Sequence, residues 1–146
     1  MDNGRQWVGF CIGTETGPRL RVTYIAATGI PEEGWHRFRV EAAVPGFTAR
    51  FEFESLLDVI AGFRDNVLAM SETLRGAAAL RFTEEDVRIH GEMSDRLGHV
   101  LWRIELRHGV WDPVTLRFNI QDDQTTLRKI AAQCNSLLKG ANARPV

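Results

Sequence analysis

The chain has 146 residues, of which 44% are hydrophobic and 25% are charged, and these proportions are typical of one soluble globular domain with a sizeable core. Its formal net charge of −1 argues against nucleic acid as a partner, because proteins that bind phosphate backbones present a basic surface. No apolar run approaches the roughly 20 residues that span a bilayer, and the N-terminal residues lack the pattern of a secretory signal. We therefore expect a cytoplasmic protein that does not contact membrane.

The first half of the chain predicts four strands followed by a helix. Residues 7–12 form a short strand-like run. Apolar and polar residues alternate, as they do in strands of a sheet with one buried face, over residues 20–24, 37–42 and 47–53. Ser55, with Asp58 three residues later, predicts a helix start of the capping-box type. An apolar stripe at spacings of three and four continues to Met70, and Gly76 is expected to end the helix.

The second half predicts the same order of elements. Its strands are expected at residues 79–82, 87–93, 99–106 and 114–120. Asp122 or Asp123 is expected to cap the last helix, Gly140 to end it, and residues 141–146 to form a flexible tail.

The two halves are similar in sequence as well as in pattern. At an offset of 64 residues, Gly98 and Trp102 align with Gly34 and Phe38, and the offset grows to 67 in the next strand and 70 in the helix. Growth at the turns alone is typical of a duplicated structural unit. We therefore predict a single domain over residues 1–140, made of similar halves at about 5–76 and 78–140.

Hairpin-linked strands followed by helices predict an α+β fold with antiparallel sheet and two helices. The two sheet halves either pair edge to edge or pack face to face, and the sequence favours neither arrangement. Because no separate linker is visible, we expect one continuous core.

The sequence contains no recognisable catalytic or metal-binding pattern. It lacks the GxSxG, GxxxxGK[ST] and HExxH motifs, and its four histidines are 54, 9 and 9 residues apart with no cysteine nearby. Cys11 and Cys134 are far apart and are expected to be reduced thiols. We therefore predict no catalytic residues, no metal site and no cofactor.

Trp111 is the residue that most favours contact with a partner. It lies in a predicted hairpin turn beside Asp112, with His108 at the start of that turn. A tryptophan at a loop tip either folds back over the sheet or serves as an anchor for a partner. All but two of the 18 basic residues are arginines, which we interpret as compositional bias, with an arginine-based recognition surface as the alternative.

Several short segments resemble the WapI-type bacterial immunity proteins. The best-matching pieces are Gly98-His99-Val100 and Asp123-Gln124-Thr125, and the resemblance covers roughly residues 20–139. It implies a cytoplasmic protein that neutralises a cognate polymorphic toxin by binding it. It also implies that the protein has no cofactor and no catalysis of its own.

Two other functions remain open from the sequence. A small-ligand-binding or enzymatic domain would need a closed apolar cavity between sheet and helices, lined by polar groups such as His90, His99 and Arg103. A homo-oligomeric structural module would use an unpaired sheet edge or an exposed helix face. The chain is thus expected to be a monomer or a homodimer.

Overall fold

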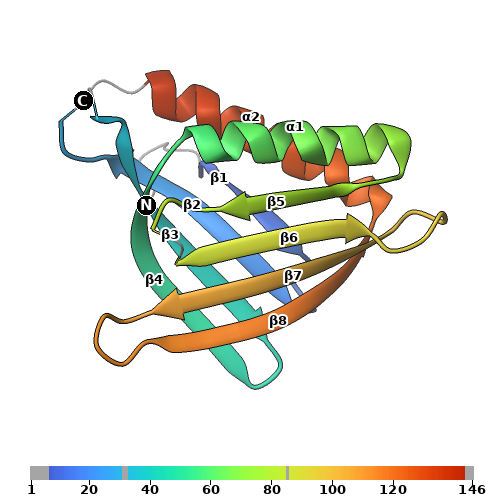
Figure 1. Ribbon diagram of the computed structural model, residues 1–146, viewed down its shortest axis with the longest axis horizontal. Coiled ribbons are helices and arrows are strands. Elements are labelled where there is room, and N and C mark those ends of the chain that lie inside the picture. The colour runs from blue at the N-terminus through green and yellow to red at the C-terminus, as the bar shows by residue number, and fades with distance from the viewer. Residues whose placement is uncertain (1–6, 31–32, 85, 144–146) are drawn as a thin grey trace.

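The chain forms two four-stranded antiparallel sheets and two long helices (Figure 1). The computed structural model describes residues 7–30, 33–84 and 86–143. Its elements in chain order are β1 (Gly9–Gly13), β2 (Arg19–Ala27), β3 (Trp35–Val44), β4 (Phe47–Leu56), α1 (Asp58–Thr73), β5 (Ala77–Arg81), β6 (Val87–Met93), β7 (His99–His108), β8 (Val114–Asp123), the 3-10 turn η2 (Gln124–Thr126) and α2 (Leu127–Ala143). The predicted α+β class is confirmed.

Each half of the chain builds one sheet. The strand order is β1-β2-β3-β4 in the first sheet and β5-β6-β7-β8 in the second, so every strand pairs with its neighbour in sequence. The halves therefore do not join edge to edge. Figure 1 shows the two sheets crossing, with both helices along one side of the molecule.

The sequence repeat corresponds to a repeat in structure. β3 and β7 are each ten residues long and begin 64 residues apart, and β4 and β8, also ten residues each, begin 67 apart. Gly34 and Gly98, which align in the repeat, both have positive φ, at 71° and 92°. Residues with a Cβ rarely adopt this conformation, so both halves use glycine to enter the third strand.

The inner faces of both sheets and both helices bury one apolar core. Phe63 of α1 joins its parts, because its ring centroid lies 5.9 Å from that of Phe10 on β1 and 6.0 Å from that of Trp102 on β7. Phe82, just after β5, lies 5.6 Å from Phe38 and 4.7 Å from Phe53 of the first sheet. Aromatic contacts thus link the halves.

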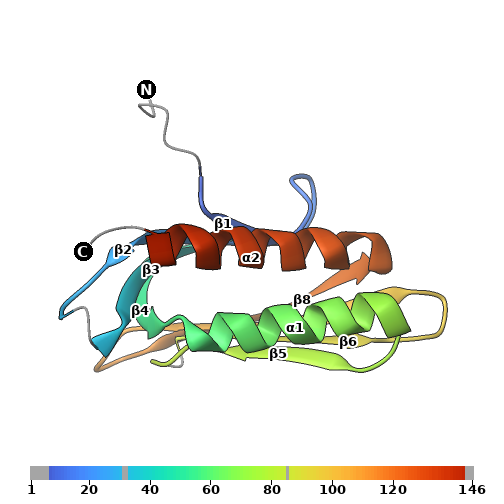
Figure 2. The ribbon, with the colours of Figure 1, turned by 90° about the horizontal axis from the view of Figure 1, so that it is seen from above.

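The helices lie side by side, and each packs beside the edge strand of the other half's sheet. Figure 2 shows α2 on the side of β1 and α1 on the side of β5. Arg64 of α1 donates to Asn135 of α2 at 3.1 Å, and Gln133 of α2 accepts from the backbone N–H of Cys11 at 3.0 Å. This exchange fixes the relative position of the two halves.

The structure corrects three predicted helix boundaries. Ser55 belongs to β4, where its hydroxyl bonds Thr83 at 2.9 Å, and α1 begins after Leu57 without a side-chain cap. Leu74, with φ of 56°, closes α1 in place of Gly76. α2 continues through Gly140 to Ala143, because neighbouring packing outweighs glycine's low helix propensity, and residues 144–146 lie outside the described part.

One of the two predicted capping residues, Asp123, precedes the last helix by one 3-10 turn. Asp123 caps the 3-10 turn that leads into α2, and its carboxylate accepts from the backbone N–H of Thr125 at 2.8 Å. This bond satisfies one of the amides that a helix start leaves unpaired.

We predict that Gly91→Ala lowers the free energy of unfolding by about 2–3 kcal/mol in urea titrations, because it overpacks the core. Gly91 pairs with Trp102, and an added Cβ would lie 2.3 Å from the indole ring, which is fully buried. The control is Gly62→Ala on α1, where nothing lies within 4 Å of an added methyl group. It should raise stability by about 0.5–1 kcal/mol, since alanine favours helix. Wild-type stability in Gly91→Ala would contradict this account of the core.

Candidate functional site

The histidines do not converge on a metal site. Among the residues that the structure describes, no group of three or more His, Cys, Asp or Glu side chains is placed to hold a metal ion. The ring of His36 shares a 2.9 Å hydrogen bond with the Tyr24 hydroxyl, and burial lowers its pKa. The carboxylate of Asp95 bonds His99 and raises the pKa of that imidazole. Within the described part of the chain, neither helix is both long and apolar enough to cross a membrane.

The turn between β7 and β8, which we call the hairpin tip (residues 108–114), concentrates exposed apolar side chains. Val110, Trp111 and Val114 are 87%, 92% and 73% exposed. Trp111 therefore points away from the sheet and does not fold back over it. Asp112 lies beside it and is also exposed.

His108 has a different position from the other two predicted partner-binding residues. It lies at the base of the hairpin tip, where its ring stacks on Phe51 of β4 with centroids 4.7 Å apart. The adjacent Arg107 donates its backbone N–H to the carbonyl of Asp86 at 2.9 Å. These contacts hold the base of the hairpin against its neighbours, and Trp111 extends beyond it.

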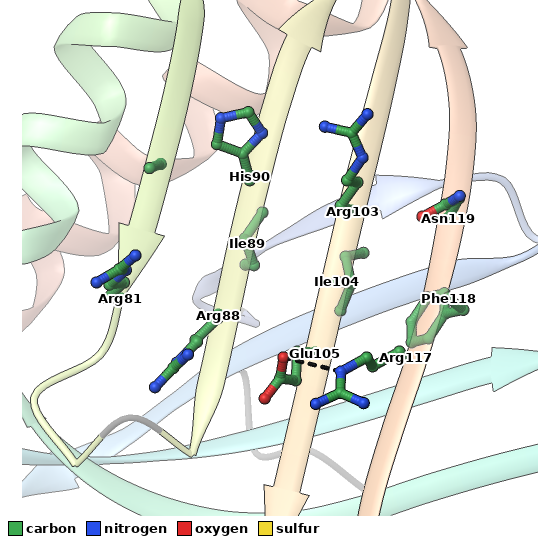
Figure 3. A pocket seen from close by; sticks show the side chains of 11 residues that line it. Arg81, Arg88, Ile89, His90, Arg103, Ile104, Glu105, Arg117, Phe118 and Asn119 are labelled. Atoms are coloured by element: carbon green, nitrogen blue, oxygen red, sulfur yellow. Dashed lines mark hydrogen bonds and ion pairs between the residues drawn. The ribbon is translucent and has the colours of Figure 1, made fainter.

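The outer face of the second sheet holds a second candidate surface, which we call the arginine face (Figure 3). It consists of two cross-strand rows lining an open hollow of about 420 Å³. The His90 row contains Ala79, His90, Arg103 and Asn119, and the Arg88 row contains Arg81, Arg88, Glu105 and Arg117. Four arginines thus surround one glutamate.

Two arginines of the arginine face form ion pairs with glutamates and remain largely exposed. Arg117 donates to Glu105 at 3.1 Å, and Arg103 pairs at 2.8 Å with Glu92, which lies outside the two rows. The side chains of Arg103 and Arg117 remain 54% and 74% exposed, so they are accessible to a partner.

The expected cavity between sheet and helices is not formed by the three residues proposed for it. His90 and Arg103 do line one hollow, but it lies on the outer face of the sheet and is open. His99 lines a different hollow, beside Ser94 and Asp122. His90 and Arg103 do lie side by side, as the hypothesis of a ligand site required. They lie on the outer face of the sheet, however, which is where the alternation of their strands places them.

The first sheet has a corresponding hollow of about 400 Å³ with a different charge pattern. Its matching row contains Cys11, Arg21, Glu41 and Arg50. In the neighbouring row Arg39 pairs with Glu52 at 3.4 Å, and beyond it Arg37 pairs with Glu54 at 3.5 Å. Ion pairs between arginine and a glutamate of a neighbouring strand therefore occur on the outer faces of both sheets.

Comparison with known proteins decides the family. The model of the "Immunity protein WapI-like family" matches residues 12–141. The chain belongs to this family. No curated protein matches this WapI-like chain.

A solved structure similar to this WapI-like protein is described as the structure of the plant transcriptional regulator PBF-2. The TM-score is 0.51 at 12% identity, over 93% of this chain and 85% of the other. The likeness at this identity concerns the fold alone.

Sequence reasoning located the hairpin turn of this WapI-like protein and left an arginine-based surface open as an alternative, but it did not place that surface on the second sheet. The signal was present, since Arg81, Arg88, Arg103 and Arg117 each occupy an outward position of a predicted strand. Their convergence depends on the strand register, which residue pattern does not specify.

We predict that a thiol reagent modifies Cys11 but not Cys134 in the native protein near neutral pH, counted by mass spectrometry. Both thiols are free, but Cys134 is fully buried, and burial raises its pKa from 9.0 to about 12. Burial also raises the pKa of Cys11, which is partly accessible, so its reaction should be slow and quicken with pH. Because the Cys134 pKa is higher in the folded state, its contribution to stability is complete below about pH 9 and declines towards pH 12. Equal labelling of both thiols would contradict the placement of Cys134.

Proposed function

We propose that this protein is an immunity protein that neutralises a cognate bacterial toxin by binding it directly in the cytoplasm, without catalysis of its own. Membership of the WapI-like immunity family carries this proposal. The exposed hairpin tip supports it, because large apolar side chains collected in one turn are typical of a surface that a partner covers.

Trp111 is suited to anchor such a partner. Its indole is 92% exposed on a turn between two strands that pair over ten positions, so a rigid scaffold presents it. Tryptophan is enriched among the few residues that dominate binding energy at protein interfaces. Asp112, directly beside it, offers a carboxylate to basic or hydrogen-bonding groups around the anchor.

Affinity capture of the tagged protein from its native cells tests the function. The expected result is recovery of a toxin domain in a one-to-one complex, with loss of the toxin's activity in the complex. A purified toxin domain that keeps its full activity when saturated with this protein would overturn the proposal.

We predict that Trp111→Ala weakens the binding of that toxin domain by at least about tenfold in calorimetric titration, as expected for the loss of an anchor residue. The matched control is Leu97→Ala, which removes an 81% exposed apolar side chain from the β6–β7 turn at the other end of β7. It should bind as wild type. Both variants should retain the wild-type unfolding midpoint, because neither side chain is buried. An equal affinity of Trp111→Ala and wild type would remove the hairpin tip from the interface.

Light scattering over a range of concentrations separates toxin binding from self-association. A constant monomer mass is expected, because the proposed partner of the hairpin tip is a different protein and not a second copy of this chain. A mass that doubles with concentration in the wild type and stays constant in Trp111→Ala would assign the hairpin tip to a homodimer.

A further inference from the structure

The two sheets have the same strand framework but carry residues of different charge at several matching outward positions. Arg103 and Arg117 of the second sheet correspond to Arg39 and Arg50 of the first, at offsets of 64 and 67 residues. The positions that match Glu52 and Glu54 hold Asn119 and Gln121. In the first sheet those two glutamates pair with Arg39 and Arg37. In the second sheet Leu101 occupies the position that matches Arg37, and Arg103, which matches Arg39, pairs with Glu92 of β6 instead.

A further difference adds positive charge to the second sheet. Arg81 takes the place in its row that Cys11 takes in the first sheet, since each is paired with the arginine on the second strand of its sheet. The side chain of Arg81 has no ion pair with another residue of the described segments. The Arg88 row thus contains three arginines and one glutamate, whereas the matching row of the first sheet contains two arginines and one glutamate.

We propose that the arginine face is a docking surface for an acidic segment of the partner protein, whose carboxylates pair with the arginines around the hollow. This inference rests on the proposed function only in identifying the partner as the toxin. Arginine suits this role because its planar guanidinium bonds a carboxylate through two parallel N–H groups.

The spacing of the rows fits an extended segment with acidic residues at alternate positions. Arg103 and Arg88 lie on adjacent strands in successive outward rows. Outward side chains two residues apart on a strand are about 7 Å apart, and adjacent strands are about 4.8 Å apart. Side chains on one face of an extended peptide recur at the same interval of about 7 Å. A short run of alternating carboxylates therefore matches both rows.

A protein segment fits this face better than a nucleic acid strand does. Single-stranded nucleic acids bind grooves in which successive bases stack on several aromatic side chains, whereas Phe118 is the one phenylalanine, tyrosine or tryptophan among the described residues that line this hollow. Glu105 lies inside the Arg88 row, and Glu92 adjoins the His90 row on β6. A continuous phosphate backbone crossing the hollow would approach both carboxylates, whereas separate carboxylate side chains can avoid them.

The arginine face is continuous with the hairpin tip, because β7 and β8 carry residues of both. Arg117 lies three residues after Val114, and Arg103 lies on the paired strand. A partner anchored on Trp111 could thus extend along the outer side of the hairpin and place its acidic segment over the hollow.

Fluorescence polarisation with a fluorescein-labelled oligoglutamate peptide tests the proposal on the full chain. The wild-type protein should bind the peptide in a saturable manner at low salt, and binding should weaken as ionic strength rises above about 0.15 M. We predict that the double variant Arg103→Gln/Arg117→Gln weakens binding by about tenfold or more, because two charge-assisted contacts are lost.

The matched control is Arg39→Gln/Arg50→Gln, which removes the equivalent arginines from the first sheet. It should change the affinity by less than about twofold, because those positions are not at the docking surface. Absence of saturable peptide binding, equal losses in the two double variants, or tighter binding of an oligothymidylate of the same charge would each overturn the proposal.

The toxin domain recovered by capture separates this inference from the proposed function. Weaker binding of the toxin domain by Arg103→Gln/Arg117→Gln, with unchanged binding by the control variant, supports both. Wild-type affinity in both double variants would refute the arginine face and leave the immunity function intact. A wild-type protein that binds the peptide but inhibits no toxin would refute the function and leave the face intact.

Discussion

The contact of Phe63 with both sheets is the constraint on which the rest of the structure depends. The ring is 1% exposed and lies about equally far from Phe10 on the first sheet and Trp102 on the second. Each sheet alone would expose an apolar face that four strands cannot cover. Because α1 closes that face together with α2, most of the large apolar side chains of the strands are buried, and the residues between them form two outer faces.

This division between inner and outer faces explains why much of the fold is predictable from the sequence. Alternation and short apolar runs identified the eight strands. The offsets of 64 and 67 residues recur in the structure as the separations between the first residues of β3 and β7 and of β4 and β8. Trp102, aligned with Phe38, is fully buried as expected. These predictions succeed because they depend on local spacing, which is the same for any sheet with one buried face.

The features that the sequence did not reveal depend on contacts between distant residues. Ser55 has the residue types of a capping box around it, but its hydroxyl bonds Thr83, 28 positions away, and the strand extends past it. Glycine near the end of a helix pattern predicts a helix end at Gly140, but the helix continues past it. A Cβ added at Gly140 would lie 3.6 Å from Val8, so this part of the helix lies against a residue distant in sequence. The arginine face is a third case, since its rows exist only in the register of four strands.

The formal charge of −1 therefore conceals a separation of charge across the molecule. The two rows of the arginine face contain four arginines and one glutamate, and the chain as a whole has slightly more acidic than basic residues. The acidic excess must lie elsewhere, and Asp95, Asp112, Asp122 and Asp123 are among the residues that supply it from turns and strand ends. Composition correctly argued against a uniformly basic protein. Composition does not locate a basic surface. Burial of one face of each sheet places the charged residues on the other face, but it does not determine whether they are positive or negative. In this duplicated fold the sign is set strand by strand, by choices such as Asn119 where the first half has Glu52. One framework can thus present two different surfaces, and the surface with more arginines in its row adjoins the hairpin tip that carries Trp111.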